Sequence, residues 1–277
     1  MMRIDAHQHF WHYDPVRDDW ITDEMSVLKR DFLPEHLEPE LAEQGIDGCV
    51  AVQADQSEDE TRFLLQLADR HAFVLGVVGW VDLRAADLYD RLEHFSRFER
   101  LCGLRHIAQA EPDDFLERED VVRGIGTLAD FDLTYDILVY PQQLRAALAL
   151  VEKLPDQPLV VDHLAKPLIR DGELEPWAAQ MGELASNPNV WCKVSGLVTE
   201  ADWSRWRPED IHPYLDVVFD AFGPDRLMFG SDWPVCLLAA SYQQVVRLID
   251  DYAAGRSAAA RNKLFGGNAL RFYELRV

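Results

Sequence analysis

Eight short apolar runs, each followed by a stretch with helix-like character, constrain the fold of this chain more than any other feature. The runs begin near Ile4, Gly48, Phe73, Leu101, Thr134, Leu159, Val190 and Leu227. Strands that alternate with helices form parallel sheets with right-handed crossovers. Eight such units predict an α/β fold, namely a (β/α)8 TIM-like barrel with its active site at the carboxyl ends of the strands.

Helical periodicity supports the same arrangement between the runs. Apolar residues recur at i, i+3, i+4 and i+7 within residues 144–151, 215–222 and 245–252, which is the spacing of an amphipathic helix. Ser57 and Glu60 form a capping-box pattern that predicts the start of a further helix. Strand and helix signals therefore alternate along the whole chain.

The chain of 277 residues is long enough for one large barrel or for two smaller domains. A doubly wound sheet is the rival architecture, but no G-x-G-x-x-G motif follows the first run. No linker rich in proline or glycine divides the sequence. We therefore expect residues 1–277 to form a single barrel domain.

Charge and composition restrict the partners. The formal net charge is −22, from 49 acidic and 27 basic residues, which argues against nucleic acid and anionic membranes as partners. No apolar run approaches the ~18 residues of a membrane helix, and Arg3 and Asp5 interrupt any signal-peptide pattern. The cysteines, far apart and without a C-x-x-C pair, predict buried reduced thiols and a cytoplasmic protein. The oligomeric state stays open.

The first run ends in two histidines, His7 and His9, spaced i, i+2. Alternate strand residues share a face, so both imidazoles would project into one volume. His163 follows the sixth run and Asp232 the eighth, and a closed barrel would place strand eight beside strand one. These four residues form a ligand set suited to a divalent, zinc-like ion. The alternative is a pair of solvated histidines near the N-terminus.

The long segment of residues 10–32 follows the first strand and carries Trp11 and Trp20. Because loops at the strand carboxyl ends build the active site of such barrels, Trp11 and Trp20 are candidates for the wall or lid of a substrate pocket. The alternative is that the indoles only plug the mouth of the barrel.

Four basic or histidine side chains are further candidates for substrate binding. Arg105 and His106 end the fourth run, and Lys166 follows His163 by three residues. Lys193 shares a strand face with Ser195, and if this face points inward its charge lies in the barrel mouth and requires a partner or a substrate. The alternative is a lysine directed to the surface.

Three motifs together resemble the amidohydrolase superfamily, and more narrowly its amidohydrolase-related branch of sugar-lactone and dicarboxylate lactonases. They are the segments 5–11 (DAHQHFW), 162–167 (DHLAKP) and 229–234 (FGSDWP). The segments 103–106 (GLRH) and 192–200 (CKVSGLVTE) resemble the members of this branch that hydrolyse L-fuconolactone. The resemblance covers essentially the whole chain and implies a (β/α)8 barrel that opens a lactone ring in sugar catabolism.

The resemblance also bears on the metal and the mechanism. Superfamily members with two metals add a carboxylated lysine on the fourth strand and a histidine on the fifth, and neither residue is present in the corresponding runs. One divalent ion, held by His7, His9, His163 and Asp232, would acidify a bound water molecule. Without a metal, Asp232 would act as the general base, and His163 or a nearby cation would polarise the lactone carbonyl. In both routes Asp232 takes the proton.

Other functions remain as alternatives. A metal-dependent decarboxylase of the same branch would use similar histidines and an aspartate. A barrel without catalytic activity that only binds a ligand would not need all four of the residues named above. Covalent catalysis by Cys192 or Ser231 is disfavoured, because the segment around Ser231 is not the G-x-S-x-G elbow. The leading hypothesis is a hydrolase acting on a small-molecule sugar lactone.

Overall fold

The computed structural model describes residues 2–276, and its eight strands form one parallel sheet in the order β1 to β8. The strands are β1 (Ile4–Gln8), β2 (Gly48–Val52), β3 (Val74–Gly79), β4 (Leu101–His106), β5 (Thr134–Ile137), β6 (Leu159–Val161), β7 (Val190–Val194) and β8 (Leu227–Phe229). Every strand except β3 begins at the residue predicted from the sequence, and β3 begins one residue later.

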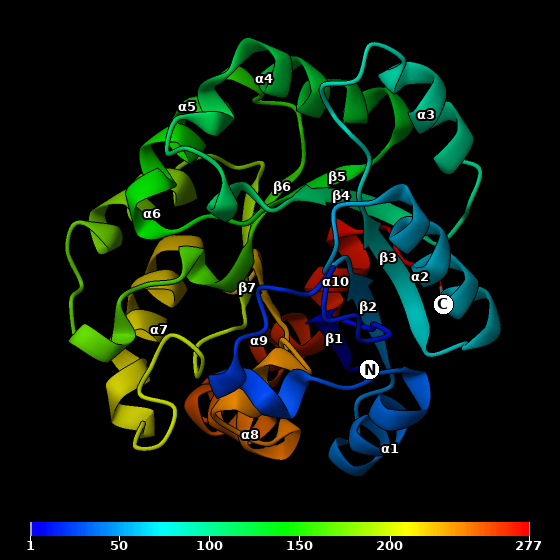
Figure 1. Cartoon of the computed structure of the whole chain (residues 1–277). Helices are drawn as coiled ribbons and strands as arrows, with labels where there is room; N and C mark the ends of the chain where they lie inside the picture. Colours follow the sequence, from blue (N-terminus) through cyan, green and yellow to red (C-terminus); the bar gives the residue numbers. More distant parts are fainter. Residues whose placement is uncertain (1, 277) are drawn as a thin grey trace.

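The sheet curls into a nearly closed barrel because β1 meets the residues that follow β8. The amide of Asp232 donates to the carbonyl of His7 at 2.8 Å, and the amide of His9 donates to the carbonyl of Trp233 at 2.7 Å. Figure 1 shows the strands at the centre of a ring of helices. The predicted (β/α)8 barrel is confirmed, and its closure places Asp232 beside the histidine pair.

Helices follow the strands around the barrel (Figure 1). Those between the strands are α1 (Pro34–Gln44), α2 (Glu58–Arg70), α3 (Leu88–Phe95), α4 (Glu119–Gly126), α5 (Leu144–Lys153), α6 (Trp177–Ala185) and α7 (Pro208–Phe222). After β8 come α8 (Tyr242–Ala253), α9 (Ala258–Asn262) and α10 (Asn268–Phe272). The three segments with predicted helical stripes lie in α5, α7 and α8.

The predicted stripes face the core, because burying an apolar stripe is what stabilises a helix of this length. In α7 the residues Leu215, Val218 and Phe222 are buried. Ser57 caps α2 by accepting from the amide of Glu60, as the capping pattern predicts. The Glu60 carboxylate, however, accepts from the amides of Ala54 and Asp55, so the reciprocal half of the capping box is absent.

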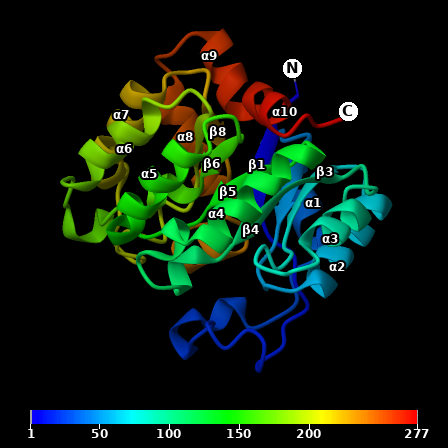
Figure 2. The same ribbon diagram turned by 90° about the horizontal axis from the view of Figure 1, so that it is seen from above.

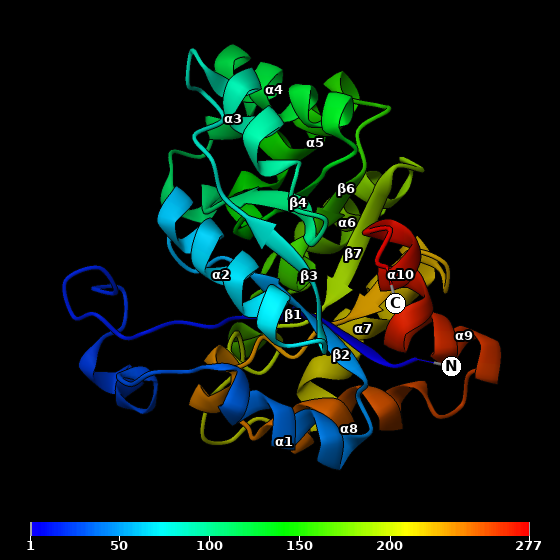
Figure 3. The same cartoon turned by 90° about the vertical axis from the view of Figure 1, so that its right-hand side faces the viewer.

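The two ends of the barrel differ. In Figures 2 and 3 the segment after β1, drawn in blue, extends from the end of the molecule opposite to α10, drawn in red. Trp11 and Phe32 join the two ends of this segment through a pair of backbone hydrogen bonds of 2.9 Å each. At the other end, Phe272 and Tyr273 pack in an apolar cluster with residues of β1, β2 and β8. The carboxyl ends of the strands therefore open toward the long loop.

The four cysteines are buried and free, as predicted. Within residues 2–276, no helix combines the length and the apolar character needed to cross a membrane.

Candidate active site and metal centre

The structure brings together the four residues that the sequence places at three strand ends. The Nε2 atoms of His7 and His9 lie 3.3 Å apart, and the Nε2 atom of His9 lies 3.3 Å from Oδ1 of Asp232. His163 approaches from β6, with its Nε2 atom 3.8 Å from the same Oδ1 atom. All four side chains are buried. They converge because β1, β6 and the segment after β8 end at the same mouth of the barrel.

Hydrogen bonds orient the histidine rings from behind. The Nδ1 atom of His9 lies 2.7 Å from the carbonyl oxygen of Val52, which can only accept, so Nδ1 carries the proton and Nε2 presents its lone pair to the site. The Nδ1 atom of His163 lies 2.9 Å from the hydroxyl oxygen of Ser195. Histidines that ligate metals are oriented in the same way, through the ring nitrogen that does not touch the ion.

Two glycines allow these rings to come close. A Cβ atom on Gly196, which has a φ of +65°, would lie 2.6 Å from Nδ1 of His163. A Cβ atom on Gly230 would lie 2.6 Å from Cβ of His7. Any side chain at either position would displace a histidine, so both glycines are steric requirements of the site.

The backbone from His163 to Lys166 is left-handed over four consecutive residues. The φ angles of His163, Leu164, Ala165 and Lys166 are 53°, 53°, 56° and 51°. Non-glycine residues adopt this region rarely, at a cost of about 1–3 kcal/mol each, and such residues concentrate at functional sites. The carbonyl of Leu164 accepts a hydrogen bond from Nε1 of Trp177 at 2.7 Å, which helps to hold the turn. The turn aims both His163 and Lys166 at the same cavity.

The candidate ligand atoms of His7, His9 and Asp232 fit a divalent metal ion. Around a tetrahedral zinc ion with bonds of about 2.0–2.1 Å, the ligand atoms lie roughly 3.3 Å from one another. His7, His9 and Asp232 have the two 3.3 Å separations given above, and Nε2 of His7 lies 3.9 Å from Oδ1 of Asp232. Three acceptor atoms that face one another this closely require a cation or a proton between them. The chemistry of this donor set, imidazole and carboxylate, is that of zinc sites.

The opposite edge of the His7 ring faces buried charges. The Nδ1 atom of His7 lies 3.0 Å from Nζ of Lys193 and 3.3 Å from Oδ1 of Asp162. Lys193 also lies 2.5 Å from Oδ2 of Asp136 and 3.0 Å from Oδ1 of Asp162. The hydroxyl of Tyr273 donates to Asp136 at 2.9 Å. We call Asp136, Asp162, Lys193 and Tyr273 the buried charge cluster.

Arg105 joins this cluster to the cavity. Its Nη1 atom donates to Oδ2 of Asp162 at 3.0 Å and lies 3.3 Å from Nε2 of His7. Its Nη2 atom donates to the carbonyl and to the side-chain oxygen of Gln53. Gln53 is therefore a partner of Arg105.

Burial and neighbouring charges shift the titration of these groups. Burial lowers the pKa of His7 well below its ordinary value and that of His163 to about 4, so both imidazoles are neutral at neutral pH. Burial alone would raise the pKa of Asp232, but the neighbouring histidines His163, His9 and His7 outweigh burial and lower this pKa, so the carboxylate stays ionised. Neutral imidazoles and an ionised carboxylate are the forms that bind a metal.

In the buried charge cluster the two aspartates shift in opposite directions. Burial would raise the pKa of Asp162, but the charge of Lys193 and the neighbouring His7 hold it well below its ordinary value. Burial raises the pKa of Asp136 to about 6, against the opposing charge of Lys193. Asp162 is therefore the carboxylate that stays charged most firmly.

A cavity of about 370 Å³ lies at the carboxyl ends of the strands. His9, His163, Asp232 and Arg105 line it from the barrel, and the segment after β1 contributes Trp11, Arg17 and Trp20. Ligand pockets typically measure about 300–1,000 Å³, so this cavity has room for a small molecule. Trp11 also packs against Phe32, with ring centroids 5.4 Å apart, so the indole is both a pocket wall and part of the loop core.

The basic candidates from the sequence divide between the cavity and the interior. Lys166 lines the cavity, with its Nζ atom 3.6 Å from Oε1 of Glu200. Lys193 does not line it, and the expectation that this charge lies at the mouth is wrong, because two aspartates hold the ammonium in the interior. The side chain of Lys193 does point into the barrel, which the sequence analysis considered, but its ammonium lies below the mouth.

His106 also lies away from the cavity lining. Its Nε2 atom is 3.0 Å from Oε1 of Glu111, its Nδ1 atom accepts from Nε1 of Trp80 at 3.2 Å, and its ring stacks on Phe115. These contacts occupy both ring nitrogens. The expectation that His106 binds substrate therefore finds no support in its position.

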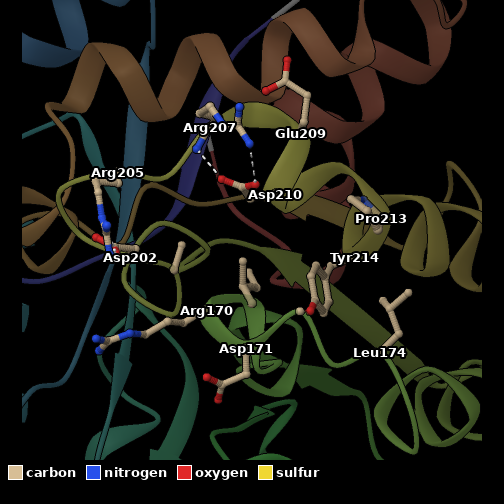
Figure 4. Close-up of a pocket in the computed structure, with 13 residues that line it drawn as sticks. Arg170, Asp171, Leu174, Asp202, Arg205, Arg207, Glu209, Asp210, Pro213 and Tyr214 are labelled. Carbon is tan, nitrogen blue, oxygen red and sulfur yellow. Dashed lines mark hydrogen bonds and ion pairs between the residues drawn. The ribbon is translucent and has the colours of Figure 1, made fainter.

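A second hollow, of about 620 Å³, lies outside the barrel mouth among the loops after β6 and β7 (Figure 4). Its arginines are paired with nearby acids: Arg205 contacts Asp202 at 2.8 Å and Arg207 contacts Asp210 at 3.6 Å. None of the four candidate metal ligands lines this hollow. The smaller cavity over the strand ends is therefore the better candidate for a catalytic site.

Sequence reasoning missed several functional neighbours. Asp136 and Asp162 each stand in or beside an apolar run, and a charged residue in such a run is a signal of a buried partner. Tyr273 and the carbonyl of Val52 give no local signal, because their roles depend on contacts across the barrel. Arg17 gives none either, since it lies in an irregular loop.

Comparisons with known proteins agree with this geometry. The sequence profile of the family described as amidohydrolase matches residues 4–275. An L-fucono-1,5-lactonase from Burkholderia multivorans is 47% identical over 99% of this chain and 96% of its own length, and one from Burkholderia ambifaria is 39% identical over the same shares. A crystal structure of a Burkholderia multivorans amidohydrolase with bound zinc covers 100% of both chains, with 46% identity and a TM-score of 0.97.

Proposed function

We propose that this chain, which belongs to the amidohydrolase family, hydrolyses the ring ester of a small sugar lactone of the L-fuconolactone type. The structural observation that carries the proposal is the meeting of His7, His9 and Asp232 beside a cavity of about 370 Å³. The curated relatives at 47% and 39% identity are both lactonases, which supports this reading over a decarboxylase.

We further propose that the centre holds one divalent, zinc-like ion on His7, His9 and Asp232, with His163 as a fourth candidate ligand. The ligand spacing described above supports this assignment, and so does the zinc in the solved relative. A bound ion of this kind would supply an acidified water molecule and polarise the lactone carbonyl.

The residues of the chain account for the proton transfers of the reaction. Asp232, which is ionised, accepts a proton from the attacking water as its oxygen bonds to the lactone carbonyl carbon. The bond between that carbon and the ring oxygen then breaks, and the ring oxygen takes up the proton that Asp232 accepted, which returns Asp232 to its ionised form. The product is a hydroxy acid, ionised at neutral pH. The Nε2 atom of His163 lies 3.8 Å from Oδ1 of Asp232, at the edge of the same cavity.

Substrate contacts are assigned to residues that line the cavity. The Arg105 guanidinium is placed to polarise the lactone carbonyl, since it reaches the cavity while Asp162 and Gln53 fix its position. Lys166 supplies a positive charge for a ring hydroxyl or for the carboxylate of the product. Trp11 offers an apolar wall for the sugar ring. With these groups, water attack without a metal is a second route, in which Asp232 alone activates the water.

The test is a pH-stat assay of the purified protein on a panel of sugar lactones, each measured with and without a chelator. We expect acid release from aldonolactones, and a loss with chelator that is restored by zinc if the metal route operates. Retention of activity in chelator would favour the metal-free route. Carbon dioxide release from aromatic or enoic acids, with every sugar lactone intact, would overturn the lactonase assignment in favour of the decarboxylase.

We also propose that residues 1–277 act as one domain and that the protein works in the cytoplasm. The first proposal is supported by a site that needs both β1 and the segment after β8. The second is supported by four free, buried cysteines, which suit a reducing compartment.

A further inference from the structure

Residues of both charge types line the catalytic cavity, and one of them has no part in the reaction described above. Among residues 2–276, the basic side chains in the lining are those of Arg17, Arg105 and Lys166. The acidic residues in the same lining are Asp55 and Asp232. Asp232 belongs to the proposed metal centre. Asp55 is therefore an acidic residue of the cavity wall that still needs an explanation.

Each basic side chain of the lining already has an acidic partner. The pairs, with their N–O distances, are Arg17 with Asp18 at 2.7 and 2.8 Å, Arg105 with Asp162 at 3.0 Å, and Lys166 with Glu200 at 3.6 Å. At distances longer than the separation within a pair, the two opposite charges largely cancel. The three pairs therefore attract an incoming anion only weakly.

Asp55 differs from these residues because its side chain is not paired. The backbone amides of Ala54 and Asp55 donate to the two oxygens of the buried Glu60 side chain, which fixes the turn after β2. Within residues 2–276, the carboxylate of Asp55 forms no ion pair and accepts no hydrogen bond. Hydrogen bonds to Asp18 are the main cause that raises the pKa of Arg17, and the charge of Asp55 is a smaller one. Arg17 thus lies near Asp55 but is held by Asp18.

Asp55 lies at the outer rim of the cavity. Trp11, Arg17 and Asp55 line both the catalytic cavity and a neighbouring hollow of about 450 Å³. Arg105 and Asp232 line the catalytic cavity but not this hollow. A lactone whose ring ester reaches Asp232 and Arg105 would therefore direct the substituents of its far side toward Asp55.

We propose that Asp55 is a specificity-determining residue, whose carboxylate accepts hydrogen bonds from hydroxyl groups of a neutral sugar lactone and excludes lactones that carry a carboxylate on the side remote from the ring ester. The inference deepens the proposed lactonase function and rests on it. An ionised carboxylate can only accept hydrogen bonds, so a hydroxyl group matches it and a second carboxylate does not. Two like charges without a cation between them supply the repulsion that discriminates against the wrong substrate.

The test compares two sugar lactones that differ in one group. L-galactonolactone ends in a hydroxymethyl group, and the galactarolactone of the same ring configuration carries a carboxylate in its place. We expect the unmodified protein to prefer the neutral lactone in kcat/KM by at least about tenfold, and Asp55→Asn to reduce this preference about tenfold. Added salt should weaken the preference of the unmodified protein more than that of the variant.

Two results would overturn the proposal. One is equal kcat/KM of the unmodified protein for both lactones, and the other is a folded Asp55→Asn protein with an unchanged ratio. If Asp55→Asn does not fold, Asp55→Ser removes the same charge and is judged by the same ratio.

Matched variants separate this charge from others nearby. Asp55→Glu keeps the carboxylate and should keep the preference for the neutral lactone. Asp59→Asn removes a carboxylate that is 97% exposed and lines the neighbouring hollow but not the catalytic cavity. This variant should leave kcat/KM for both lactones unchanged. A reduction of the preference in Asp59→Asn as large as that in Asp55→Asn would overturn the assignment to Asp55.

Calorimetric titration separates this inference from the proposed function. Asp232→Asn should stop turnover, so the intact lactones can be titrated into this variant. It should bind L-galactonolactone more tightly than the galactarolactone, and adding Asp55→Asn should narrow the difference about tenfold. If the unmodified protein hydrolyses no lactone, the proposed function fails, and this titration still decides the role of Asp55. A difference in affinity that Asp55→Asn leaves unchanged, or no binding of either lactone, would overturn the inference.

Discussion

The two edges of the His7 ring face opposite kinds of environment. On the Nε2 edge, lone pairs of His9 and Asp232 meet beside a cavity, and Nη1 of Arg105 lies 3.3 Å from Nε2 of His7. On the Nδ1 edge, Lys193 and Asp162 satisfy one another in the interior. One edge is arranged for a reaction and the other for fixed geometry.

The two lysines near these edges differ in their exposure to solvent. The side chain of Lys166 is 18% exposed and lines the cavity, whereas that of Lys193 is fully buried between two aspartates. A buried charge pair contributes little net stability but is costly to break, while a partly exposed pair is worth about 0–1 kcal/mol. Substitutions on the Nε2 side should therefore change catalysis, and substitutions on the Nδ1 side should change stability first.

The largest expected effect is on the Nε2 side. Asp232→Asn keeps the shape of the side chain but cannot accept a proton. We expect lactonase kcat to fall about 10²–10⁴-fold, roughly 3–5 kcal/mol in activation free energy, with little change in the urea midpoint. A folded Asp232→Asn enzyme that retains more than about a tenth of its rate would contradict the role of this carboxylate.

The next effect tests the Nδ1 side. Lys193→Met leaves two buried aspartates without their shared cation, and we expect the free energy of unfolding to fall by about 3–5 kcal/mol. The double variant Asp136→Asn/Lys193→Met removes one charge of each sign and should be less destabilised than the single variant. Urea denaturation of the four corners of this cycle measures the coupling. Equal destabilisation of the single and double variants would show that the charges are not coupled.

Lys166→Met is the matched substitution on the cavity side. The free energy of unfolding should change by less than about 1 kcal/mol, because the pair with Glu200 is partly exposed and 3.6 Å long. The KM for a sugar lactone should rise about tenfold, which corresponds to about 1.4 kcal/mol, if the ammonium contacts substrate. A variant with unchanged KM would remove Lys166 from the binding site.

A smaller effect appears in the dependence of stability on pH. Burial lowers the pKa of His163 to about 4 in the folded protein, against about 6.5 in an unfolded chain. Between these values the unfolded state binds more protons, so the metal-free protein should lose stability as the pH falls from about 6.5 to about 4. His163→Gln should lose less over this window, as measured by urea midpoints at several pH values. Parallel curves for the two proteins would contradict the buried, neutral state of His163.

The sequence predicts the barrel and the meeting of the four candidate ligands well, because both depend on local signals. Strand and helix periodicities locate the elements, and parallel strands bring His7, His9, His163 and Asp232 to one end. The residues beside Nδ1 of His7 could not be predicted in the same way. Alternation along a strand says which face bears Lys193, but it does not say how deep in the barrel the ammonium lies. The depth of the Lys193 ammonium is set by its contact with Asp136, which Tyr273 in turn holds by a hydrogen bond. No local sequence pattern links these three residues.

The meeting of β1 with the segment after β8 also has a consequence for synthesis. His7 and His9 are synthesised well before Asp232, and backbone hydrogen bonds between the two segments hold them together in the folded protein. A nascent or truncated chain that stops before β8 carries the histidine pair without the carboxylate. Such a chain lacks the residue that we propose as third ligand and proton acceptor, so we expect lactonase activity only after β8 and the segment that follows it have been made.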